Sequence, residues 1–561
     1  MKSVPDCESC KLTKTIARTM PMAKLSLKFQ KGGIFVEKKW RKLPVGIQSF
    51  EKLITDNFLY VDKTEYIYRL VHTNVPYFLS RPRRFGKSLL VSSMKAYWEG
   101  KKELFKGFAI ENLEKDNADS WQKYPVLCFD FNGVNYQEKG AFEESLNIQL
   151  SRWESTYSDD NNKGTLAERF QRLLIEAKEK TGRRVVILVD EYDKPLLDVS
   201  GKKELQEHNK EVMKGFFSTL KSFDEYIQFI FITGVSKFHK VSIFSDLNQL
   251  KDISLTAEFS GICGITEDEI KKYFMPEVKL LAEQQKMTEE ECFEALKKQY
   301  DGYHFSVNSD GVYNPFSLLC ALFDKDFGAY WFETGTPTFL LEKLKNTEFD
   351  VRKFTDMTLF ANESMLKDYT GEGDDPIPLL YQTGYLTIVG YDSTGREYTL
   401  SFPNEEVKYG FIESLLPEYV SGCGAGSGKD IFTLRRYIEK GELDNIRNVL
   451  TALFASIPYT QKKNLFEHYF QTVIYLVFTL LGKLVQCEMY TNTGRIDCKV
   501  ETKNYVYLFE FKRDETADSA LKQINDKEYA LPFVADTRKL YKIGVSFDSQ
   551  KRILADWKVA E

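Results

Sequence analysis

Three consecutive residues, Gly86, Lys87 and Ser88, have the side chains needed to bind a nucleotide phosphate. They follow a short apolar run and precede a helical pattern, which is the context in which a phosphate-binding loop works. The glycine lets the backbone approach the phosphates, the lysine reaches the β and γ phosphates, and the serine holds Mg²⁺. The full pattern GxxxxGK[ST] has a further glycine at position 81, where this sequence has Arg81. The motif is therefore degenerate.

An acidic pair, Asp190 and Glu191, ends a second apolar run, RRVVILVDE (183–191). Because α/β sheets bind ligands at the carboxyl ends of their strands, this pair should face the phosphate-binding loop. We expect Asp190 to position Mg²⁺ through Ser88 or a water, and Glu191 to orient or deprotonate the attacking water. The alternative is a tight turn and an acidic strand end that bind no ligand.

Two further groups are candidates for contact with ATP. Thr233, near the end of the run YIQFIFITG (226–234), is placed to contact the γ phosphate, although capping of the strand is the more common role for such a hydroxyl. Arg81, Arg83 and Arg84 either contact phosphates or form a solvated basic turn, and the sequence leaves both roles open. We include Arg81 and Thr233 among the predicted ATP-binding residues.

A second group of charged residues, Asp497, Glu510 and Lys512, has the spacing Asp-x(12)-Glu-x-Lys. If Lys503 and Asn504 form a two-residue turn, a β-hairpin places Asp497 opposite Glu510. Side chains alternate along a strand, so all three residues then share one face of the sheet. The two opposed carboxylates, with Cβ atoms about 4.5–5.5 Å apart, repel each other unless a cation lies between them.

Hard oxygen ligands at that separation favour Mg²⁺ or Mn²⁺. Such an ion holds a phosphate oxygen and lowers the pKa of a bound water for attack on phosphorus, while Lys512 steers or activates that water. The alternative is a charged edge hairpin, joined by an ion pair from Arg495 to Glu510 or from Asp497 to Lys512.

Four apolar runs predict strands of a parallel sheet that helices cover on both faces. The runs are VPYFLS (75–80), YPVLCFDF (124–131), RRVVILVDE (183–191) and YIQFIFITG (226–234). From about residue 266 to about residue 370 the pattern is mainly helical, which is typical of a lid or connector. The Gly-rich stretch 421–430 predicts a linker from which no amphipathic helix opens directly. It is not a second phosphate-binding loop, because Asp430 stands where serine or threonine is required.

A smaller mixed α/β unit is predicted after the linker. Its helices are expected at about 463–482 and 516–530, and its strands at about 484–490, 495–501, 505–512 and 542–548. The apolar segment 469–482 is shorter than the roughly 18 residues that a membrane span needs, so we expect a buried helix and no membrane contact.

Composition limits the remaining function classes. The formal charge is −5, from 77 Lys plus Arg against 82 Asp plus Glu, so contacts with nucleic acid must be local. Nine cysteines are scattered, and Cys7 with Cys10 has no second pair that would complete a zinc site. Together with an N-terminus that lacks a secretory apolar stretch, this predicts reduced thiols and a cytoplasmic location.

The chain resembles the bacterial AAA-ATPase-like family that is typically fused to a C-terminal PD-(D/E)XK nuclease-like domain. The resemblance spans about 43–335 and 463–557, and rests on these stretches: LPVGIQSFEKLITDNFLYVDKTEYIYRLV, RPRRFGKSLL, ILVDEYDKPL, FITGVSKF, YDGYHF and YNPFSLL. It implies a P-loop ATPase fold that tolerates Arg81 in place of glycine. It also implies that Glu467 and Gln523 are accessory nuclease residues beside Asp497, Glu510 and Lys512.

The predicted fold class is therefore α/β, with a P-loop NTPase-type parallel sheet and a helical extension, followed by a smaller mixed α/β restriction-endonuclease-like domain. The predicted domains are a poorly ordered leader (1–42), an AAA-ATPase-like P-loop domain (43–260), a helical lid or connector (261–420), a Gly-rich linker (421–430) and a PD-(D/E)XK nuclease-like domain (431–561).

We expect a protein that binds and hydrolyses ATP and is coupled to a Mg²⁺-dependent nuclease acting on DNA, with RNA as the second choice and a homo-oligomer as an open option. The alternative function is a nucleotide-dependent switch or scaffold whose nuclease-like domain binds nucleic acid or protein without cleaving it. A third option is a structural adaptor in which both sites are relics.

Overall fold

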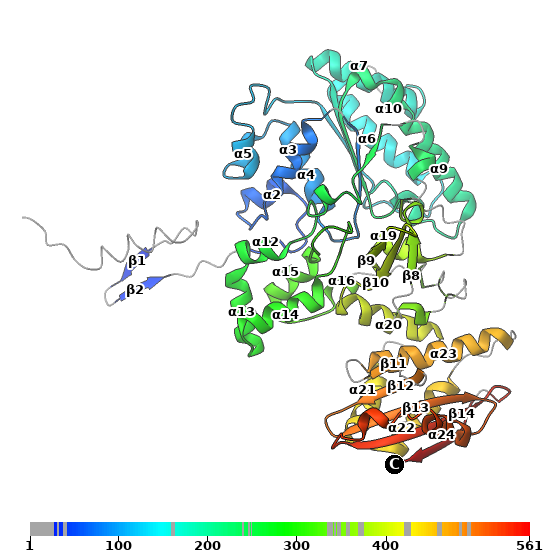
Figure 1. Ribbon diagram of the computed structural model, residues 1–561. Coiled ribbons are helices and arrows are strands. Elements are labelled where there is room, and N and C mark those ends of the chain that lie inside the picture. Colours follow the sequence, from blue (N-terminus) through cyan, green and yellow to red (C-terminus); the bar gives the residue numbers. More distant parts are fainter. Residues whose placement is uncertain are drawn as a thin grey trace, which may run out of the picture.

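The computed structural model contains two α/β units with a mainly helical extension between them (Figure 1). The described residues are 27–30, 33–36, 42–73, 75–158, 163–237, 240–244, 247, 249–333, 340–341, 344, 349, 351–354, 359–367, 375–419, 428–456, 463–481, 485–490, 495–551 and 553–561. Most of the predicted leader, including Cys7 and Cys10, lies outside them. Within the leader, β1 (Leu27–Gln30) and β2 (Gly33–Val36) pair as an antiparallel hairpin.

The larger sheet has five parallel strands in the order β4-β5-β6-β3-β7. Its strands are β3 (Tyr77–Ser80), β4 (Val126–Asp130), β5 (Val185–Asp190), β6 (Ile227–Gly234) and β7 (Lys251–Asp252). The four predicted strands are confirmed. No apolar run marks β7, because both of its residues are charged. Since β6 lies between β5 and β3, the acidic end of β5 and the loop after β3 meet across the end of β6.

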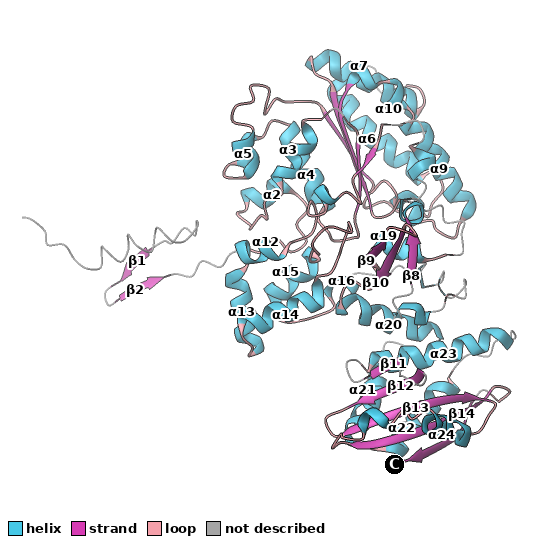
Figure 2. Cartoon of the chain, viewed as in Figure 1, coloured by secondary structure: helices cyan, strands magenta, loops and turns pink. Residues whose placement is uncertain are grey.

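Helices cover both faces of this sheet, as its apolar strands require. Figure 2 shows α3 and α4 on one side and α7 and α9 on the other. The helices of this unit are α2 (Phe50–Thr55), α3 (Thr64–Val71), α4 (Lys87–Trp98), α5 (Ala109–Leu113), α6 (Ala141–Tyr157), α7 (Leu166–Thr181), α8 (Lys194–Leu197), α9 (Lys203–Phe217), α10 (Thr219–Ser222) and α11 (Lys240–Ile243). All six residues of β5 are buried.

The extension is helical at first, as predicted, and then includes a small sheet that was not expected. Its helices are α12 (Glu267–Tyr273), α13 (Met275–Gln285), α14 (Glu289–Tyr300), α15 (Pro315–Asp324), α16 (Tyr330–Glu333), α18 (Glu363–Lys367), α19 (Ile377–Thr383) and α20 (Glu405–Tyr419). Three antiparallel strands, in the order β8-β10-β9, interrupt this series: β8 (Leu359–Asn362), β9 (Thr387–Asp392) and β10 (Glu397–Ser401). The description of 261–420 as a helical connector is therefore incomplete.

The predicted linker also needs correction. Helix α21 (Gly428–Lys440) begins inside the predicted linker 421–430, so residues 428–430 are helical. Residues 421–427 lie outside the described residues. The helix forms because Ile431, Leu434 and Ile438 recur at helical spacing and are all buried. Together with α22 (Leu443–Ala455), it packs against the C-terminal unit.

The C-terminal unit has a five-stranded sheet in the order β11-β12-β13-β14-β15, in which only β13 and β14 are parallel. Its elements are α23 (Lys463–Leu480), β11 (Val485–Tyr490), β12 (Arg495–Glu501), β13 (Tyr505–Arg513), α24 (Ala517–Asp526), β14 (Lys539–Asp548) and β15 (Ile553–Ala560). The predicted elements are confirmed, and β15 is added at the edge. The apolar segment of α23 is buried at Val473, Leu476 and Phe478, and no helix in the described part of the chain could span a membrane.

One buried carboxylate joins three helices of the extension. Glu406, in the first turn of α20, is 1% exposed. Its Oε1 accepts hydrogen bonds from Ser317 Oγ of α15 (3.0 Å) and from the backbone N–H of Trp331 of α16 (2.7 Å). Burial raises the pKa of Glu406 to about 7. The charged form is therefore disfavoured in the folded protein.

Replacing Glu406 with glutamine should change how stability depends on pH. Because its pKa is raised on folding, the folded state holds the proton more tightly than the unfolded chain does. This contribution to stability is greatest below the ordinary pKa of 4.5 and is lost as the pH rises to about 7. In urea unfolding, the stability of E406Q relative to wild type should increase by up to about 3 kcal/mol across that window. A difference that is independent of pH would contradict this explanation.

Candidate active sites

The loop between β3 and α4 turns sharply onto the start of a helix. Gly86, with a φ of 94°, precedes the first residue of α4, Lys87, and Arg84 has a φ of 67°. Glycine adopts such positive angles without a steric penalty, which explains Gly86. The first N–H groups of a helix have no partner within it and carry partial positive charge. The loop therefore presents backbone donors suited to an anion.

Lys87 bonds to its own loop. Its Nζ donates to the carbonyl oxygens of Arg81 (2.9 Å) and Pro82 (3.1 Å), and the residue is 5% exposed. A bound phosphate would offer a charged acceptor in place of these two neutral ones, and hydrogen bonds between charged groups are the stronger kind. Lys87 is thus buried and positioned beside the place where a phosphate would bind.

The structure corrects the expectation for Arg81, whose side chain points to the back of the loop. Its guanidinium donates to the carbonyl oxygens of Ser80 (2.9 Å), Ser254 (2.8 Å) and Phe259 (3.0 Å). It also lies 3.9 Å from the ring centre of Phe305, and the residue is 1% exposed. Arg81 does not line the pocket in front of the loop. Where the full motif has a glycine, this chain has a buried anchor.

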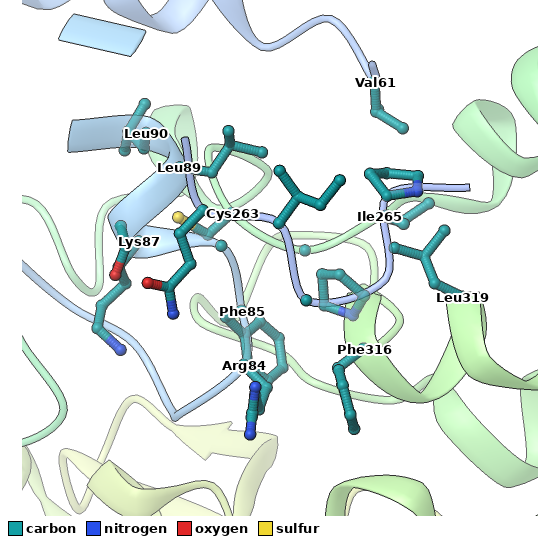
Figure 3. A pocket seen from close by; sticks show the side chains of 18 of the residues that line it. Val61, Arg84, Phe85, Lys87, Leu89, Leu90, Cys263, Ile265, Phe316 and Leu319 are labelled. Atoms are coloured by element: carbon teal, nitrogen blue, oxygen red, sulfur yellow. The ribbon is translucent and has the colours of Figure 1, made fainter. Parts of the chain in front are cut away.

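A pocket of about 400 Å³ lies in front of the loop (Figure 3). Its polar part includes Gly86, Lys87, Ser88, Asn132, Glu191 and Lys194. Its apolar part includes Ile47, Leu59, Val61, Ile262, Ile265, Phe316 and Leu319. A pocket with one charged end and one apolar end suits a ligand that carries both phosphates and a flat ring system. Asn132 and Lys194 were not predicted, because no motif marks them.

The two acidic residues at the end of β5 have different surroundings, because Glu191 lines the pocket and Asp190 is buried beside it. Glu191 lines the pocket and has a φ of 54°. Burial raises its pKa, and the positive charge of Lys87 opposes that shift. Asp190 is 5% exposed, and its Oδ1 accepts a 2.6 Å hydrogen bond from Thr233 Oγ1. Asp190 and Thr233 do not line the pocket, so the hydroxyl of Thr233 has the strand-end role rather than contact with a phosphate.

Sequence reasoning missed Asp193, which fixes the segment after β6. Its carboxylate accepts hydrogen bonds from the backbone N–H groups of Val235 (3.2 Å) and Ser236 (2.6 Å), and from Ser236 Oγ (2.6 Å). Gly234 permits this contact, because a Cβ there would lie 2.9 Å from Asp193 Oδ1 and 2.6 Å from the ring of Tyr192. The acidic stretch DEYDKP was the available signal, but its third carboxylate has a structural role.

The C-terminal hairpin has the predicted register. Cys498 pairs with Phe509 across β12 and β13, which places the turn at Lys503 and Asn504. One residue beyond this pair, Asp497 Oδ2 accepts a 2.8 Å hydrogen bond from the N–H of Phe511. The pairing therefore brings the predicted carboxylates of Asp497 and Glu510 to the same end of the sheet.

Glu510 is buried with its charge incompletely balanced. It is 1% exposed, its Oε1 lies 3.5 Å from Lys512 Nζ, and its Oε2 has no hydrogen-bond partner among the described residues. Burial, and then the negative charge of Asp497, raise the pKa of Glu510. Lys512 Nζ also donates to Gln523 Oε1 of α24 at 2.5 Å. Four of the predicted nuclease residues are thus brought together.

The donor set of this site fits a hard divalent cation. Asp497 and Glu510 supply carboxylate oxygens, and Mg²⁺ commonly binds through one or two carboxylates while keeping several waters. In the described part of the chain, no group of three or more His, Cys, Asp or Glu residues is arranged so that it could hold a metal ion, so Asp497 and Glu510 would need waters or substrate oxygens to complete the shell. The side chains of Glu467 and Arg495 lie outside the described residues, and their predicted roles stay predictions.

Comparison with known proteins finds both units. A family model described as a predicted AAA-ATPase matches residues 44–244, and a model of the PD-(D/E)XK nuclease superfamily matches residues 465–557. A relative described as an uncharacterized protein in the vnfD 5′ region of Azotobacter chroococcum mcd 1 is 35% identical over 534 residues. That match covers 92% of this chain and 99% of the relative.

Restoring the motif glycine should destabilise the protein. Arg81→Gly removes donors from the buried carbonyl groups of Ser80, Ser254 and Phe259, so we expect the free energy of unfolding to fall by about 2–4 kcal/mol. Arg83→Gly is the matched control, because Arg83 lies in the same loop but is exposed. Urea unfolding of both variants makes the comparison. Equal stabilities of the two variants would show that Arg81 is not an anchor.

Proposed function

Because the chain belongs to the AAA-ATPase-like proteins that carry a C-terminal PD-(D/E)XK nuclease superfamily domain, we propose that it hydrolyses ATP and cleaves DNA in a Mg²⁺-dependent reaction. One observation carries the proposal: each unit brings its oppositely charged motif residues together at one place. Lys87 and Glu191 line one pocket, and Lys512 lies beside Glu510 at the hairpin.

In the ATPase step, the first turn of α4 and Lys87 bind the phosphates, and the apolar part of the pocket accommodates the base. Ser88 and Asp190 would hold Mg²⁺, which supplies positive charge to the phosphate oxygens. Because Asp190 does not line the pocket, it would reach Mg²⁺ through a water or after a shift of its side chain. Glu191, whose pKa is raised, accepts a proton from the attacking water.

In the nuclease step, Asp497 and Glu510 would hold Mg²⁺, or Mn²⁺ in its place, and the metal would lower the pKa of the attacking water. Lys512, held by Gln523, orients that water and offsets the charge that develops on the phosphate. Glu467 on α23 is proposed as an accessory acid. DNA is the first choice of substrate and RNA the second.

The surroundings of the nuclease site support local rather than global attraction for DNA. The chain has a formal charge of −5, whereas the half-exposed Arg513 lies next to Lys512, and we expect it to contact a phosphate backbone in addition to its 3.4 Å ion pair with Asp514. The described cysteines Cys128, Cys263, Cys292 and Cys320 are free thiols, which supports a reducing compartment, the cytoplasm.

Removal of the loop lysine should weaken nucleotide binding. Lys87→Ala loses the charge that reaches the phosphates, so we expect the Kd for ATP to rise by about 100-fold. Lys95→Ala is the control on the same helix, since Lys95 forms a surface ion pair with Glu99 at 2.8 Å and does not line the pocket. Glu191→Gln should bind ATP normally and hydrolyse it about 100-fold more slowly. Calorimetry and phosphate release measure the two effects, and unchanged binding by Lys87→Ala would refute the ATP site.

Neutralising either nuclease carboxylate should stop cleavage. With plasmid or single-stranded DNA and Mg²⁺ or Mn²⁺, Asp497→Ala and Glu510→Gln should reduce the cleavage rate by about 100-fold or more, because metal and water are no longer held. Asp526→Ala, an exposed carboxylate at the end of α24, is the control. Salt-dependent DNA binding that survives Glu510→Gln, with no cleavage by wild type under any metal, would instead favour the switch or scaffold.

A further inference from the structure

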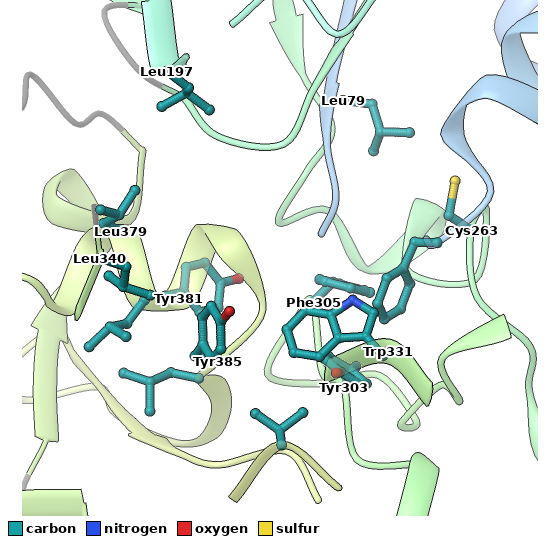
Figure 4. Close-up of a cluster of buried hydrophobic side chains, with 14 of the residues drawn as sticks. Leu79, Leu197, Cys263, Tyr303, Phe305, Trp331, Leu340, Leu379, Tyr381 and Tyr385 are labelled. Atoms are coloured by element: carbon teal, nitrogen blue, oxygen red, sulfur yellow. The ribbon is translucent and has the colours of Figure 1, made fainter. Parts of the chain in front are cut away.

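The helical extension contacts three consecutive residues of the phosphate-binding loop, Pro82, Arg83 and Arg84. Trp331, on α16, donates its indole N–H to the carbonyl oxygen of Arg83 at 3.1 Å. The ring is buried, with the ring of Tyr385 at 5.3 Å between centroids (Figure 4). A single side chain thus fixes the position of a backbone carbonyl in the middle of the loop.

Two further contacts hold the neighbouring loop residues. The guanidinium of Arg84 lies 4.6 Å from the ring centre of Phe316, at the start of α15. Pro82 packs against Gly384, where a Cβ would come within 2.7 Å of the proline ring. Three consecutive contacts therefore make the conformation of the loop depend on the extension.

Glu406 connects this support to the long helix α20. The backbone N–H of Trp331 donates to Glu406 Oε1, which also accepts from Ser317 of α15. On the next turn of α20, Gly410 lies so close to Phe332 that a Cβ there would be 2.6 Å from the phenyl ring. Helix α16 therefore cannot move relative to the loop without a change in its contact with α20.

Helix α20 in turn packs along α23 of the C-terminal unit (Figure 1). On the sheet side of α23, the ring of Phe478 lies 5.2 Å from that of Phe509 and 5.9 Å from that of Phe511. These residues flank Glu510 on β13, and the N–H of Phe511 binds the carboxylate of Asp497. Packed contacts thus connect the loop to β13, where the backbone N–H of Phe511 reaches one of the proposed metal ligands.

We infer that Trp331 is a positioning residue for the phosphate-binding loop, and that Glu406, α20 and α23 transmit the state of that loop to the nuclease carboxylates. The inference rests on the proposed function, because it gives the two activities a physical connection. When Lys87 leaves the carbonyl groups of Arg81 and Pro82 for a phosphate, the adjoining carbonyl of Arg83 changes its environment. Trp331 is affected by that change because its indole N–H donates to the carbonyl oxygen of Arg83. Coupling of this kind is reciprocal, so metal and ATP alter each other's affinity by the same factor.

The test uses the full chain and compares two tryptophans of similar burial. Trp331→Phe keeps an aromatic ring but removes the N–H that binds Arg83. Trp98→Phe is the matched control, because Trp98 is 5% exposed against 6% for Trp331 and its indole N–H has no hydrogen-bond partner among the described residues. The measured quantity is the ratio of DNA cleavage rates with and without ATP, together with the affinity for Mn²⁺ with and without ATP.

For wild type we expect ATP to change the DNA cleavage rate and the affinity for Mn²⁺ by at least about fivefold each. Mn²⁺ should change the affinity for ATP by the same factor as ATP changes the affinity for Mn²⁺. Trp98→Phe should keep that factor. At saturating ATP, Trp331→Phe should cleave DNA at the rate that it has without ATP, so its factor should fall to about one. Gly410→Ala places a methyl group of α20 against the ring of Phe332 and so displaces α16, and it should lower the factor as well.

The outcomes separate the inference from the proposed function. If wild type binds ATP and cleaves DNA but shows no effect of one on the other, the coupling is overturned and the function stands. A Trp331→Phe protein with the full wild-type factor also overturns it. If wild type neither binds ATP nor cleaves DNA, the proposed function fails, and the inference fails with it.

Discussion

The placement of β3 between β6 and β7 is the constraint on which the N-terminal unit depends. On one side, β6 carries Thr233 to the buried Asp190 at the end of β5. On the other side, the chain that leaves β7 passes behind the phosphate-binding loop, where the carbonyl groups of Ser254 and Phe259 accept from Arg81. The same passage leads into the helical extension that contacts the loop again through Trp331. A different strand order would separate all of these contacts.

The main strands and the hairpin register could be predicted, because each is marked by a short stretch of sequence. The four main strands of the larger sheet are apolar runs with a length that identifies them without knowledge of their partners. The hairpin register follows from a two-residue turn and from side-chain alternation, and these two features are enough to predict that Asp497, Glu510 and Lys512 lie together. Gln523, by contrast, came from the family resemblance, because it approaches Lys512 only through the packing of α24.

What could not be predicted depends on contacts between residues far apart in the chain. Arg81 resembles a phosphate contact in sequence, and only the carbonyl groups of Ser254 and Phe259 reveal it as an anchor. The strand β7 has two charged residues, so hydrogen bonding to β3 defines it rather than any apolar run. Trp331 and Glu406 belong to no motif, and their roles follow from their position beside the loop.

The two proposed sites differ in how completely the ligand-free chain satisfies their charges, and this affects what a ligand gains on binding. Lys87 already donates to two carbonyl groups, so a phosphate replaces existing hydrogen bonds and the net gain there is moderate. Nucleotide affinity must then draw on the helix N-terminus and the apolar wall of the pocket. Glu510 is buried with an oxygen that has no partner in the described structure. A cation relieves that penalty, so metal binding should stabilise the C-terminal unit as well as enable its chemistry.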